Sequence, residues 1–439
     1  MSRRPDSPWR RRAAAAVLAL AVLGAGGRAA AQTCGDGTGD GAVTQPDAIR
    51  ILRAAAALPV ACDLGVCDVD DDGRLTTDDG VAALRAAAGL PATLRCGDLG
   101  PRRGMLRSLT VVVILPAYRA LDQAAAALVA AVDLLAAAPA ADTLAAARAA
   151  WRAERRAWKR TEAFRLGPSE TQRTDARIDW SPIRPDNVES TIAAGSVQGA
   201  SDVDALGATV VGSLAMEHVL FDPAGDAAVL AAVAGPGGAD RRAYLRALAA
   251  NLKERTAVLR AAWEPAQGDF GEELVNAGLI GGEFASLKAA VDELVNRVVF
   301  TAEQVEELKL ADPLGLNRGG IDPTRLESPR SGSSRADALD ELLGIRDVYL
   351  GRRAPEVGGG IGGVLAGVSP ALDEQVRRLL AEAIAAVRRI PEPLSASLVA
   401  RPDLVEDAYV AVQAFRRALV LDLAPALGVT LTFGGTDGD

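Results

Sequence analysis

An alternation of apolar residues three and four positions apart is the feature that most constrains this chain. One such stripe runs from Tyr118 to Leu135, and a second runs from Val405 to Leu423. This spacing places apolar side chains on one face of a helix that packs against other helices. Strand patterns are almost absent. The sequence therefore predicts an all-α fold, with two helical bundles side by side. Further helices are expected at 142–166, 203–221, 240–263, 283–310 and 370–390.

The first 31 residues have the parts of an export signal. Arginines at positions 3, 4 and 10 to 12 precede an apolar run from Ala13 to about Gly26, and alanines fill positions 29 to 31. The run is too short to span a bilayer, and it ends in small residues that suit a signal peptidase. We expect cleavage after Ala31 and no transmembrane span in the remaining chain. The mature protein is expected to be secreted, periplasmic or on the outer cell surface.

Cleavage would leave an acidic protein. The segment carries six Arg and one Asp, so its removal moves the formal net charge from -9 to -14. An acidic chain gains little from phosphate backbones, which argues against nucleic acid as a partner.

The cysteines all lie before residue 97, at Cys34, Cys62, Cys67 and Cys96. An even number in a small exported module indicates two disulfides, each worth roughly 2–4 kcal/mol. If the helices of this module pack antiparallel, the pairs Cys62–Cys67 and Cys34–Cys96 are favoured. Because the composition also changes near residue 100, we expect at least two domains. The expected parts are a module over 34–96, a linker over 97–106 and a helical domain over 107–439.

Two segments in this module repeat at an offset of 32 residues: DGTGDGAVTQPD from Asp36 and DVDDDGRLTTDD from Asp68. Each has oxygen-bearing side chains at loop positions 1, 3, 5 and 12, Gly at position 6 and an aliphatic residue at position 8. Ca²⁺ takes six to eight oxygen ligands from a tightly curled loop of this kind. The expected ligands are Asp36, Thr38, Asp40, the Ala42 carbonyl and Asp47 in the first loop, and Asp68, Asp70, Asp72, the Arg74 carbonyl and Asp79 in the second. The alternative is a pair of solvated acidic turns.

A helical pattern follows each loop, and the pair resembles a dockerin, in which Asp closes each calcium loop. The resemblance implies a calcium-stabilised module that docks to a cohesin-like partner. Dockerins read their partner at loop positions 10 and 11, which are here Gln45-Pro46 and Thr77-Asp78. These pairs depart from the usual small hydroxyl residues.

The stretch WRAERRAWKRTEAFRLGP covers residues 151–168. Helical spacing places five of its side chains on one face, with Gly167-Pro168 ending the helix. Buried charges must be paired, so a face that mixes indoles with charges indicates a polar pocket or a network between helices. The alternative is that arginine stems pack over tryptophan at the surface. The five residues are Trp151, Arg155, Trp158, Glu162 and Arg165.

This stretch is similar to the imelysin family, together with IDWSP (178–182), GSLAMEHVLF (212–221), LESPRSGSS (326–334) and LGVTLTFGGTDGD (427–439). The matches follow the order of the family over about residues 107–439. The resemblance implies two helical bundles, a periplasmic or outer-surface location and a role linked to iron uptake. Members are also classed as imelysin peptidases.

The signature of the family is GxHxxE, a His and a Glu one helical turn apart that form a presumed metal pair. Gly212 and Glu217 match it, but Leu214 stands at the His position. The chain's one histidine, His218, is next to Glu217, and neighbours on a helix point about 100° apart. A zinc hydrolase commonly needs three protein ligands that include histidine, and a serine nucleophile at Ser328 or Ser331 would need a base. These residues argue against a conventional peptidase.

Four carboxylates occupy family-like positions: Glu162, Asp179, Glu217 and Glu327. Hard oxygen ligands of this kind could hold Fe³⁺ or another cation without histidine. Salt bridges to Arg155 and Arg165 inside the bundle are the equally weighted alternative.

The sequence thus predicts an exported imelysin-like binding protein in metal or iron acquisition, with a calcium-binding module. Two alternatives remain open. One is a degenerate imelysin-type metallopeptidase. The other is a calcium-dependent interaction scaffold with a cohesin-like or cell-surface protein partner.

Overall fold

The computed structural model describes residues 33–56, 58, 60, 62, 64–67, 69–70, 76–96, 99–278, 282–354 and 356–432. The expected export signal therefore lies outside the described residues, as does the end of the closing family-like segment. The chain divides into two compact units, Met1–Gly97 and Asp98–Asp439.

The first unit has three described helices: α1 (Gln45–Ala55), α2 (Leu64–Cys67) and α3 (Thr77–Ala87). Helices α1 and α3 follow the two repeated loops and pack against each other. Both begin with the same capping box, in which a threonine precedes the helix and the loop-closing Asp47 or Asp79 accepts the threonine N–H. The 32-residue repeat of the sequence is therefore also a repeat of local structure.

Disulfides close this unit. Cys34 is bonded to Cys96 and Cys62 to Cys67, the pairing that the sequence favours. Their side chains join a small core with Ile51, Val66 and Ala83. Because so small a core supplies little stability alone, the cross-links hold the unit together.

The second unit starts with a continuous helix made of α4 (Leu99–Leu109), the π-helical η2 (Thr110–Ile114) and α5 (Leu115–Ala137). Most of the segment expected as a linker, 97–106, is thus helical. The reason is burial, since Met105 and Leu106 are almost fully enclosed.

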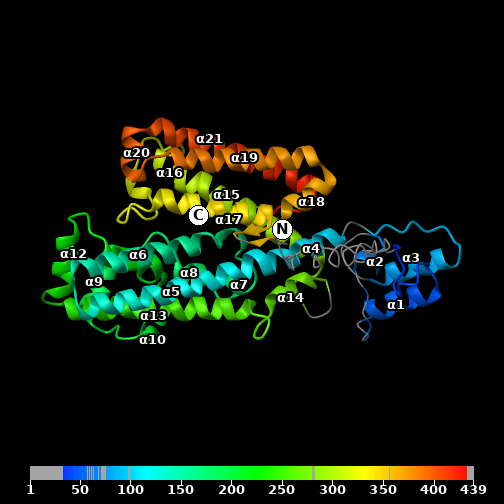
Figure 1. Ribbon diagram of the computed structural model, residues 1–439, viewed down its shortest axis with the longest axis horizontal. Helices are drawn as coiled ribbons and strands as arrows, with labels where there is room; N and C mark the ends of the chain where they lie inside the picture. The colour runs from blue at the N-terminus through cyan, green and yellow to red at the C-terminus, as the bar shows by residue number, and fades with distance from the viewer. Residues whose placement is uncertain are drawn as a thin grey trace, which may run out of the picture. The chain divides into compact units, whose positions relative to one another are not determined.

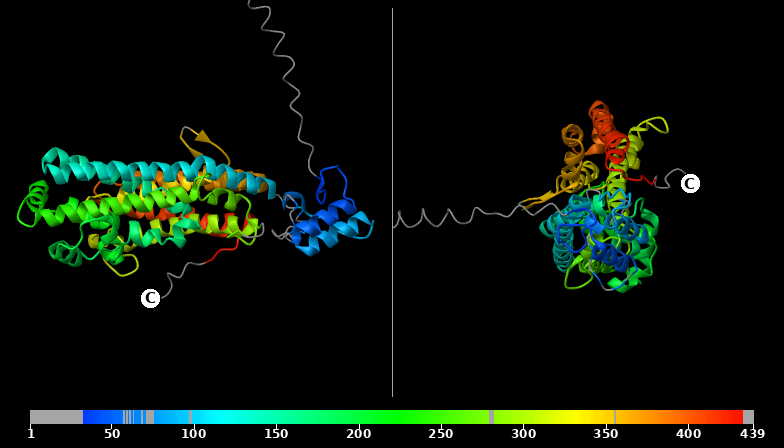
Figure 2. Two further views of the ribbon diagram at one scale, coloured as in Figure 1. Left: turned by 90° about the horizontal axis from the view of Figure 1, so that it is seen from below. Right: turned by 90° about the vertical axis from the view of Figure 1, so that its right-hand side faces the viewer.

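Helix α5 packs between α6 (Ala141–Lys159) and α13 (Gly238–Trp263) to form the first bundle (Figures 1 and 2). Shorter segments complete it: η3 (Glu162–Phe164), α7 (Pro168–Thr171), α8 (Thr174–Ile178), α9 (Pro185–Ala194), α10 (Ala200–Asp204), η4 (Ala208–Val210), α11 (Gly212–Leu220), α12 (Asp226–Ala234) and α14 (Phe270–Val275).

By length and composition alone, the helix Gly100–Ala137 could cross a membrane. Its apolar stripe from Tyr118 to Leu135 is buried. Two of its charged side chains pair with α13: Asp122 with Lys253 and Arg260, and Asp133 with Arg246. It is therefore the central helix of the first bundle.

The second bundle lies beside the first and is coloured yellow to red in Figure 1. Its long helices are α15 (Leu287–Glu303), α17 (Ser334–Leu350), α19 (Pro370–Arg389) and α21 (Pro402–Ala418). Shorter elements are η5 (Gln304–Ala311), α16 (Asp312–Leu314), η6 (Pro323–Arg325), β1 (Arg352–Arg353), β2 (Glu356–Val357), α18 (Ile361–Val368), α20 (Leu394–Ala400), η7 (Leu419–Leu423) and α22 (Ala424–Ala426). The antiparallel pair of β1 and β2 is the one sheet of the described chain. Helix α17 joins the bundles by packing on α6.

Two expected helices are interrupted. The helix expected over 142–166 ends at Lys159, because the Thr161 N–H and hydroxyl both turn back to the Trp158 carbonyl, each at 2.7 Å. Gly167 and Pro168 therefore start α7 and do not end α6. The expected helix over 203–221 is three short segments, with a break at Gly207 and a positive φ of 78° at Gly212.

Candidate functional site

Arg155 lies at the centre of a buried charge network between the bundles. Its side chain is 1% exposed, and Nη1 lies 2.6 Å from Asp179 Oδ1. Nε and Nη2 donate to Asp337 at 3.0 and 2.9 Å. Nη2 is also 3.2 Å from Glu327. Trp151 and Trp158 beside it are fully buried, so the alternative of arginine stems over surface tryptophan is wrong.

Lys159 extends the network one turn further along α6. Its Nζ lies 2.6 Å from both Asp179 and Glu327 and 3.3 Å from Glu341. Residues 155 and 159 are one turn apart on α6, and their partners 337 and 341 are one turn apart on α17. Two helices thus face each other with complementary charges.

Lys309 is the third buried cation and comes from the π-helical η5. It pairs with Glu327 and lies 3.1 Å from Glu341. π-Helical turns are rare and are frequent at functional sites. The described chain has two further π-helical stretches, η2 and η7, so the turn alone does not assign a function to this network.

The two glutamates that share these lysines have different proton affinities. Burial opposes ionisation of Glu327, but Lys159, Lys309 and Arg155 hold its pKa well below the usual range. Burial raises the pKa of Glu341 to about 7 against the pull of the same lysines. Near neutral pH the site therefore holds a fixed anion and a carboxyl that exchanges its proton.

A cavity of about 540 Å³ opens onto this network. Its buried end is formed by the charged groups Lys159, Asp179, Lys309, Glu327 and Glu341. The remaining lining residues are Glu162, Arg165, Trp180, Ser181, Pro182, Phe300, Thr301, Gln304, Leu308, Asp312, Thr324, Arg325 and Leu326. The expected polar pocket is thus present, with charged groups inside and apolar groups among its walls.

Glu162 and Arg165 lie beyond the end of α6, yet both line the cavity. Arg165 Nε is 2.9 Å from Glu162 Oε2. Asp179 and Glu327 likewise pair with Arg155, so three of the four candidate carboxylates form the salt bridges of the alternative interpretation. Ser328 is fully buried and donates to Asp337, which places it behind the cavity and within the network.

Gly212 brings helix α11 against this site. A Cβ at Gly212 would lie 2.4 Å from the carbonyl oxygen of Ile178, the residue before Asp179. Only glycine fits so close an approach with a positive φ. This glycine of the family signature therefore sets the distance between α11 and the segment that carries Asp179.

Glu217 is the one candidate carboxylate without a cation partner among the contacts of the described chain. Its Oε1 accepts the Ser331 N–H at 2.8 Å. Burial raises its pKa to about 7. It does not line the cavity, and Leu214 at the signature's histidine position is buried.

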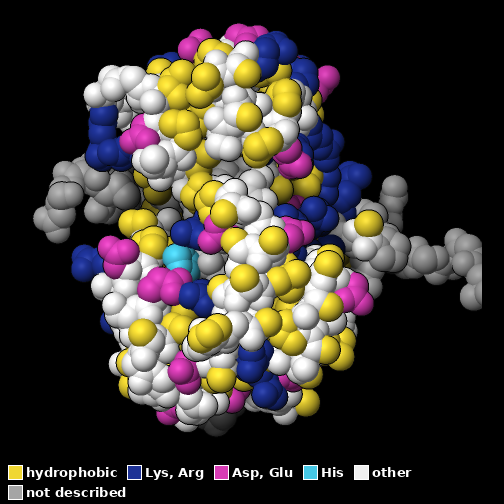
Figure 3. All heavy atoms as spheres, turned by 90° about the vertical axis from the view of Figure 1, so that its left-hand side faces the viewer, with side chains coloured by type: hydrophobic (Ala, Val, Ile, Leu, Met, Phe, Trp, Pro, Cys, Tyr) yellow, Lys and Arg dark blue, Asp and Glu magenta, His cyan; other side chains and the backbone are white. Residues whose placement is uncertain are grey.

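His218 bonds elsewhere, as the 100° offset on the helix predicts. Its Nε2 lies 2.7 Å from Glu189, which also pairs with Arg241. On the face shown in Figure 3 the histidine forms a small patch beside acidic and basic side chains. Burial lowers its pKa, so it is held neutral near neutral pH.

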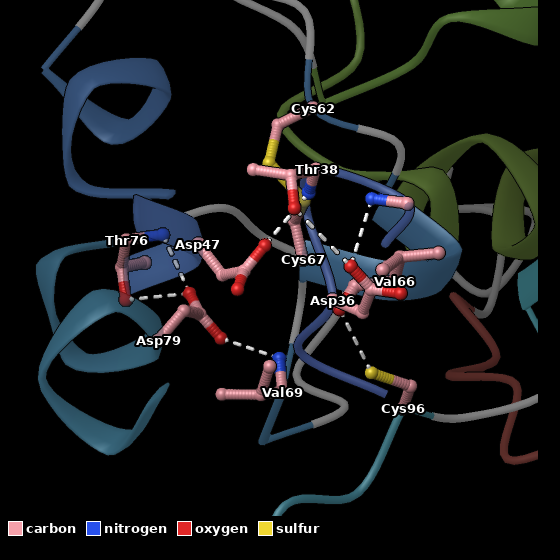
Figure 4. Close-up of a disulfide and its surroundings, with 11 residues drawn as sticks. Asp36, Thr38, Asp47, Cys62, Val66, Cys67, Val69, Thr76, Asp79 and Cys96 are labelled. Carbon is pink, nitrogen blue, oxygen red and sulfur yellow. Dashed lines mark hydrogen bonds between the residues drawn. A yellow bond between two sulfur atoms is a disulfide. The ribbon is translucent and has the colours of Figure 1, made fainter. Parts of the chain in front are cut away.

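The first repeated loop curls around its own acidic side chains (Figure 4). Asp36 accepts the N–H groups of Gly39 and Gly41, both at 2.7 Å, and Asp47 accepts that of Thr38 at 2.8 Å. Ligand atoms of Asp36, Asp40 and Asp47 all lie within 4.8 Å of one another. Within the described ranges, this is the one group of three or more His, Cys, Asp or Glu residues close enough to share a metal ion.

The remaining expected calcium ligands are only partly described. Thr38 lies within the first loop, and the Ala42 N–H donates to Asp40. In the second loop Asp79 likewise accepts a loop N–H, that of Val69 at 2.8 Å, one loop position earlier than the contact of Asp47 with Thr38. Asp70 is described, whereas Asp68, Asp72 and Arg74 lie outside the described residues.

Sequence reasoning missed four residues of the network: Lys159, Lys309, Asp337 and Glu341. Lys159 lies inside the 151–168 stretch. Opposite charges at matching one-turn intervals on two helices could have indicated Asp337 and Glu341. Lys309 depends on a π-helical turn, for which the sequence has no pattern that we recognise.

Comparisons with known proteins agree with this fold. The family model named imelysin matches residues 114–421. Iron-regulated protein A of Synechococcus elongatus is 30% identical over 289 residues, which cover 65% of this chain and 75% of that protein. A crystal structure of an iron-regulated protein A precursor from Parabacteroides distasonis aligns with a TM-score of 0.65 at 20% identity, covering 74% of this chain and 95% of that one.

An imelysin-like protein from Psychrobacter arcticum aligns with a TM-score of 0.60 at 18% identity, covering 77% of this chain and 98% of that one. At these identities the two crystal structures show a shared fold. The family model covers more than half of the chain and includes Arg155, Asp179, Gly212 and Glu327. The chain belongs to the imelysin family.

Proposed function

We propose that this protein is an exported binding protein with a role in iron acquisition, and that its helical domain takes its ligand in the cavity beside Lys159 and Lys309. The observation that carries the proposal is the cavity itself, in which a π-helical turn brings buried, oppositely charged groups to one open space of about 540 Å³. The iron-related part is supported by the similarity to iron-regulated protein A.

Iron retention tests this proposal. The mature full-length chain, freed of metal, is dialysed against iron supplied both as a simple salt and with weak chelators, and bound iron is measured by elemental analysis. Retention of iron in either form, and its loss on Glu341→Gln, is the expected result. If no form of iron is retained, the proposed role in iron binding is wrong.

The first unit serves, in this proposal, as a calcium-binding module of the dockerin type. Support comes from the clustered ligand atoms of Asp36, Asp40 and Asp47 and from the loop-closing carboxylates at the starts of α1 and α3. Coordination would use the carboxylate oxygens in place of some of their present contacts with loop N–H groups.

A protein partner is the second part of this proposal. Gln45 and Pro46 on α1 and Thr77 and Asp78 on α3 are all exposed. One turn further on, two aliphatic side chains at repeat-equivalent positions, Ile49 and Val81, are 53% and 49% exposed. Apolar side chains repeated on an exposed face suit a cohesin-like or cell-surface protein. Calcium-dependent capture of a purified cohesin domain, compared with the Ile49→Asp variant, tests this docking.

A further inference from the structure

The carboxylates of the cavity are already neutralised by protein cations. Asp179 lies 2.6 Å from both Arg155 and Lys159, and Glu327 is shared by Lys159 and Lys309. A bare metal ion at this position would face buried ammonium groups and would have to displace them. Separating buried ion pairs is costly, because each charge left without a partner has lost its solvent as well. The network is therefore poorly suited to coordinate a bare ion.

The size of the cavity supports the same conclusion. Its volume is about 540 Å³. A water molecule takes roughly 30 Å³, so an ion with six waters would occupy less than half of this space and contact only part of its walls. A small organic molecule fills it better.

The walls offer surfaces for organic groups. Trp180 and Leu308 line the cavity and are 41% and 53% exposed. Thr301 and Gln304 add neutral polar groups. At the buried end, Glu341 is 2% exposed, and its Oε2 has no hydrogen-bond partner among the described residues. The Glu341 side chain lines this end of the cavity, and its unsatisfied oxygen becomes available to a polar group of the ligand when the side chain turns toward it.

The charges of the lining are nearly balanced. Five acidic and four basic side chains line the cavity, and Arg155 contacts two of the acids from behind. A ligand with a strong net charge of either sign would gain little from such a lining. The balance therefore favours a ligand without net charge.

We infer that the cavity takes iron as a small, uncharged organic ferric chelate, whose own oxygen atoms keep the metal while Trp180, Leu308 and Glu341 contact the organic part. This inference rests on the proposed role in iron binding and specifies the chemical form of the iron. The protein contributes no atom to the metal's coordination sphere.

Ferric tris(acetohydroxamate) is a suitable probe because it is neutral and small enough for the cavity. Equilibrium dialysis of the mature full-length protein compares this chelate with ferrous salt under anaerobic conditions, anionic ferric citrate, and metal-free acetohydroxamate. The expected result is retention of the neutral chelate, with its visible charge-transfer band unchanged. Trp180→Ala should weaken retention by about tenfold, the equivalent of one buried aromatic contact. The matched control Leu134→Ala, at a side chain that is 61% exposed and outside the cavity, should leave it unchanged.

The possible outcomes separate this inference from the proposal on which it rests. Two outcomes overturn the chelate inference and leave iron binding intact. One is retention of ferrous salt that is lost in Glu341→Gln or Glu327→Gln. The other is a shifted charge-transfer band, which reports ligand exchange onto the protein. Retention of ferric citrate in place of the neutral chelate overturns the assignment of charge. If no iron species is retained, both the inference and the proposed iron role fall.

Discussion

Arg155 donates two hydrogen bonds to one carboxylate oxygen of Asp337, with Nε at 3.0 Å and Nη2 at 2.9 Å. The two side chains are 1% and 4% exposed. This contact joins α6 of the first bundle to α17 of the second, so the two bundles meet at a charged centre and not only through apolar side chains.

Replacing Arg155 tests how much the stability of the protein depends on this charged centre. Arg155→Met leaves three carboxylates, Asp179, Glu327 and Asp337, with fewer cations. Removal of one partner from a buried ion pair typically costs about 3–5 kcal/mol. We expect a loss of this size in urea unfolding of the mature protein.

A matched control is Arg378→Met, because Arg378 pairs with Glu382 on the surface of α19. An exposed pair of this type is worth less than about 0.5 kcal/mol. Equal losses for the two variants would contradict the importance of the buried network.

The buried carboxyl of Glu154 should make the free energy of unfolding depend on pH. It is fully buried, and burial together with the nearby charge of Asp179 raises its pKa from the usual 4.5 to about 8. Between these values the folded state holds a proton that the unfolded state releases, so stability falls as pH rises, by up to about 1.4 kcal/mol per pH unit.

The Glu154→Gln variant cannot lose that proton. The difference in unfolding free energy between about pH 5.5 and about pH 8 should shrink by as much as about 3 kcal/mol relative to the parent protein. Urea unfolding at both pH values measures this difference. Glu382→Gln, at an exposed position, is the control and should leave the pH dependence unchanged.

Gly212 allows steric clash and backbone strain to be separated. Gly212→Ala places a methyl group 2.4 Å from the Ile178 oxygen in a backbone with positive φ. Gly225 also has a positive φ, but a Cβ there meets no atom within 4 Å. We expect Gly225→Ala to cost about 1–2 kcal/mol from strain alone and Gly212→Ala to cost clearly more. Thermal unfolding measures both, and equal shifts would show that the close approach to Ile178 is unimportant.

Helical periodicity predicted the bundles because the buried stripes of α5, α19 and α21 depend only on local spacing. The same periodicity predicts a single helical face from Trp151 to Arg165, but the helix ends at Lys159. Trp151, Arg155 and Trp158 were correctly placed together inside the protein. Glu162 and Arg165 reach the cavity through a 3₁₀ turn, which the periodicity argument did not include.

The partners of the network were harder to predict because they come from distant segments. Asp337 is 182 residues from Arg155, and Glu327 is 168 residues from Lys159. Such pairs depend on how α6 and α17 pack, which spacing within either segment does not specify. In the small unit, by contrast, the loop residues lie within twelve positions of one another, so the clustering of Asp36, Asp40 and Asp47 was evident from the sequence.

Calcium should stabilise the first unit through those three residues. At a calcium concentration one hundred times the dissociation constant, calcium should stabilise the unit by about 2.7 kcal/mol. Asp36→Asn removes one charged ligand and should reduce this stabilisation at the same calcium concentration. Calorimetric unfolding with and without a calcium chelator measures this stabilisation. Asp78→Asn removes the same charge from an exposed position outside the expected ligands, so this control should keep the full calcium effect.

The chain has one histidine, so other side chains must account for proton exchange near neutral pH. Imidazole is normally the side chain that changes charge between about pH 5 and 8. Here His218 is bonded to Glu189 and its pKa is lowered by burial, whereas buried Glu217 and Glu341 have pKa values of about 7 and Glu154 of about 8. The groups of the helical domain with pKa values of about 7 to 8 are therefore carboxylic acids. On passing from acidic to neutral surroundings these carboxyls add negative charge to the interior, whereas a histidine would lose positive charge.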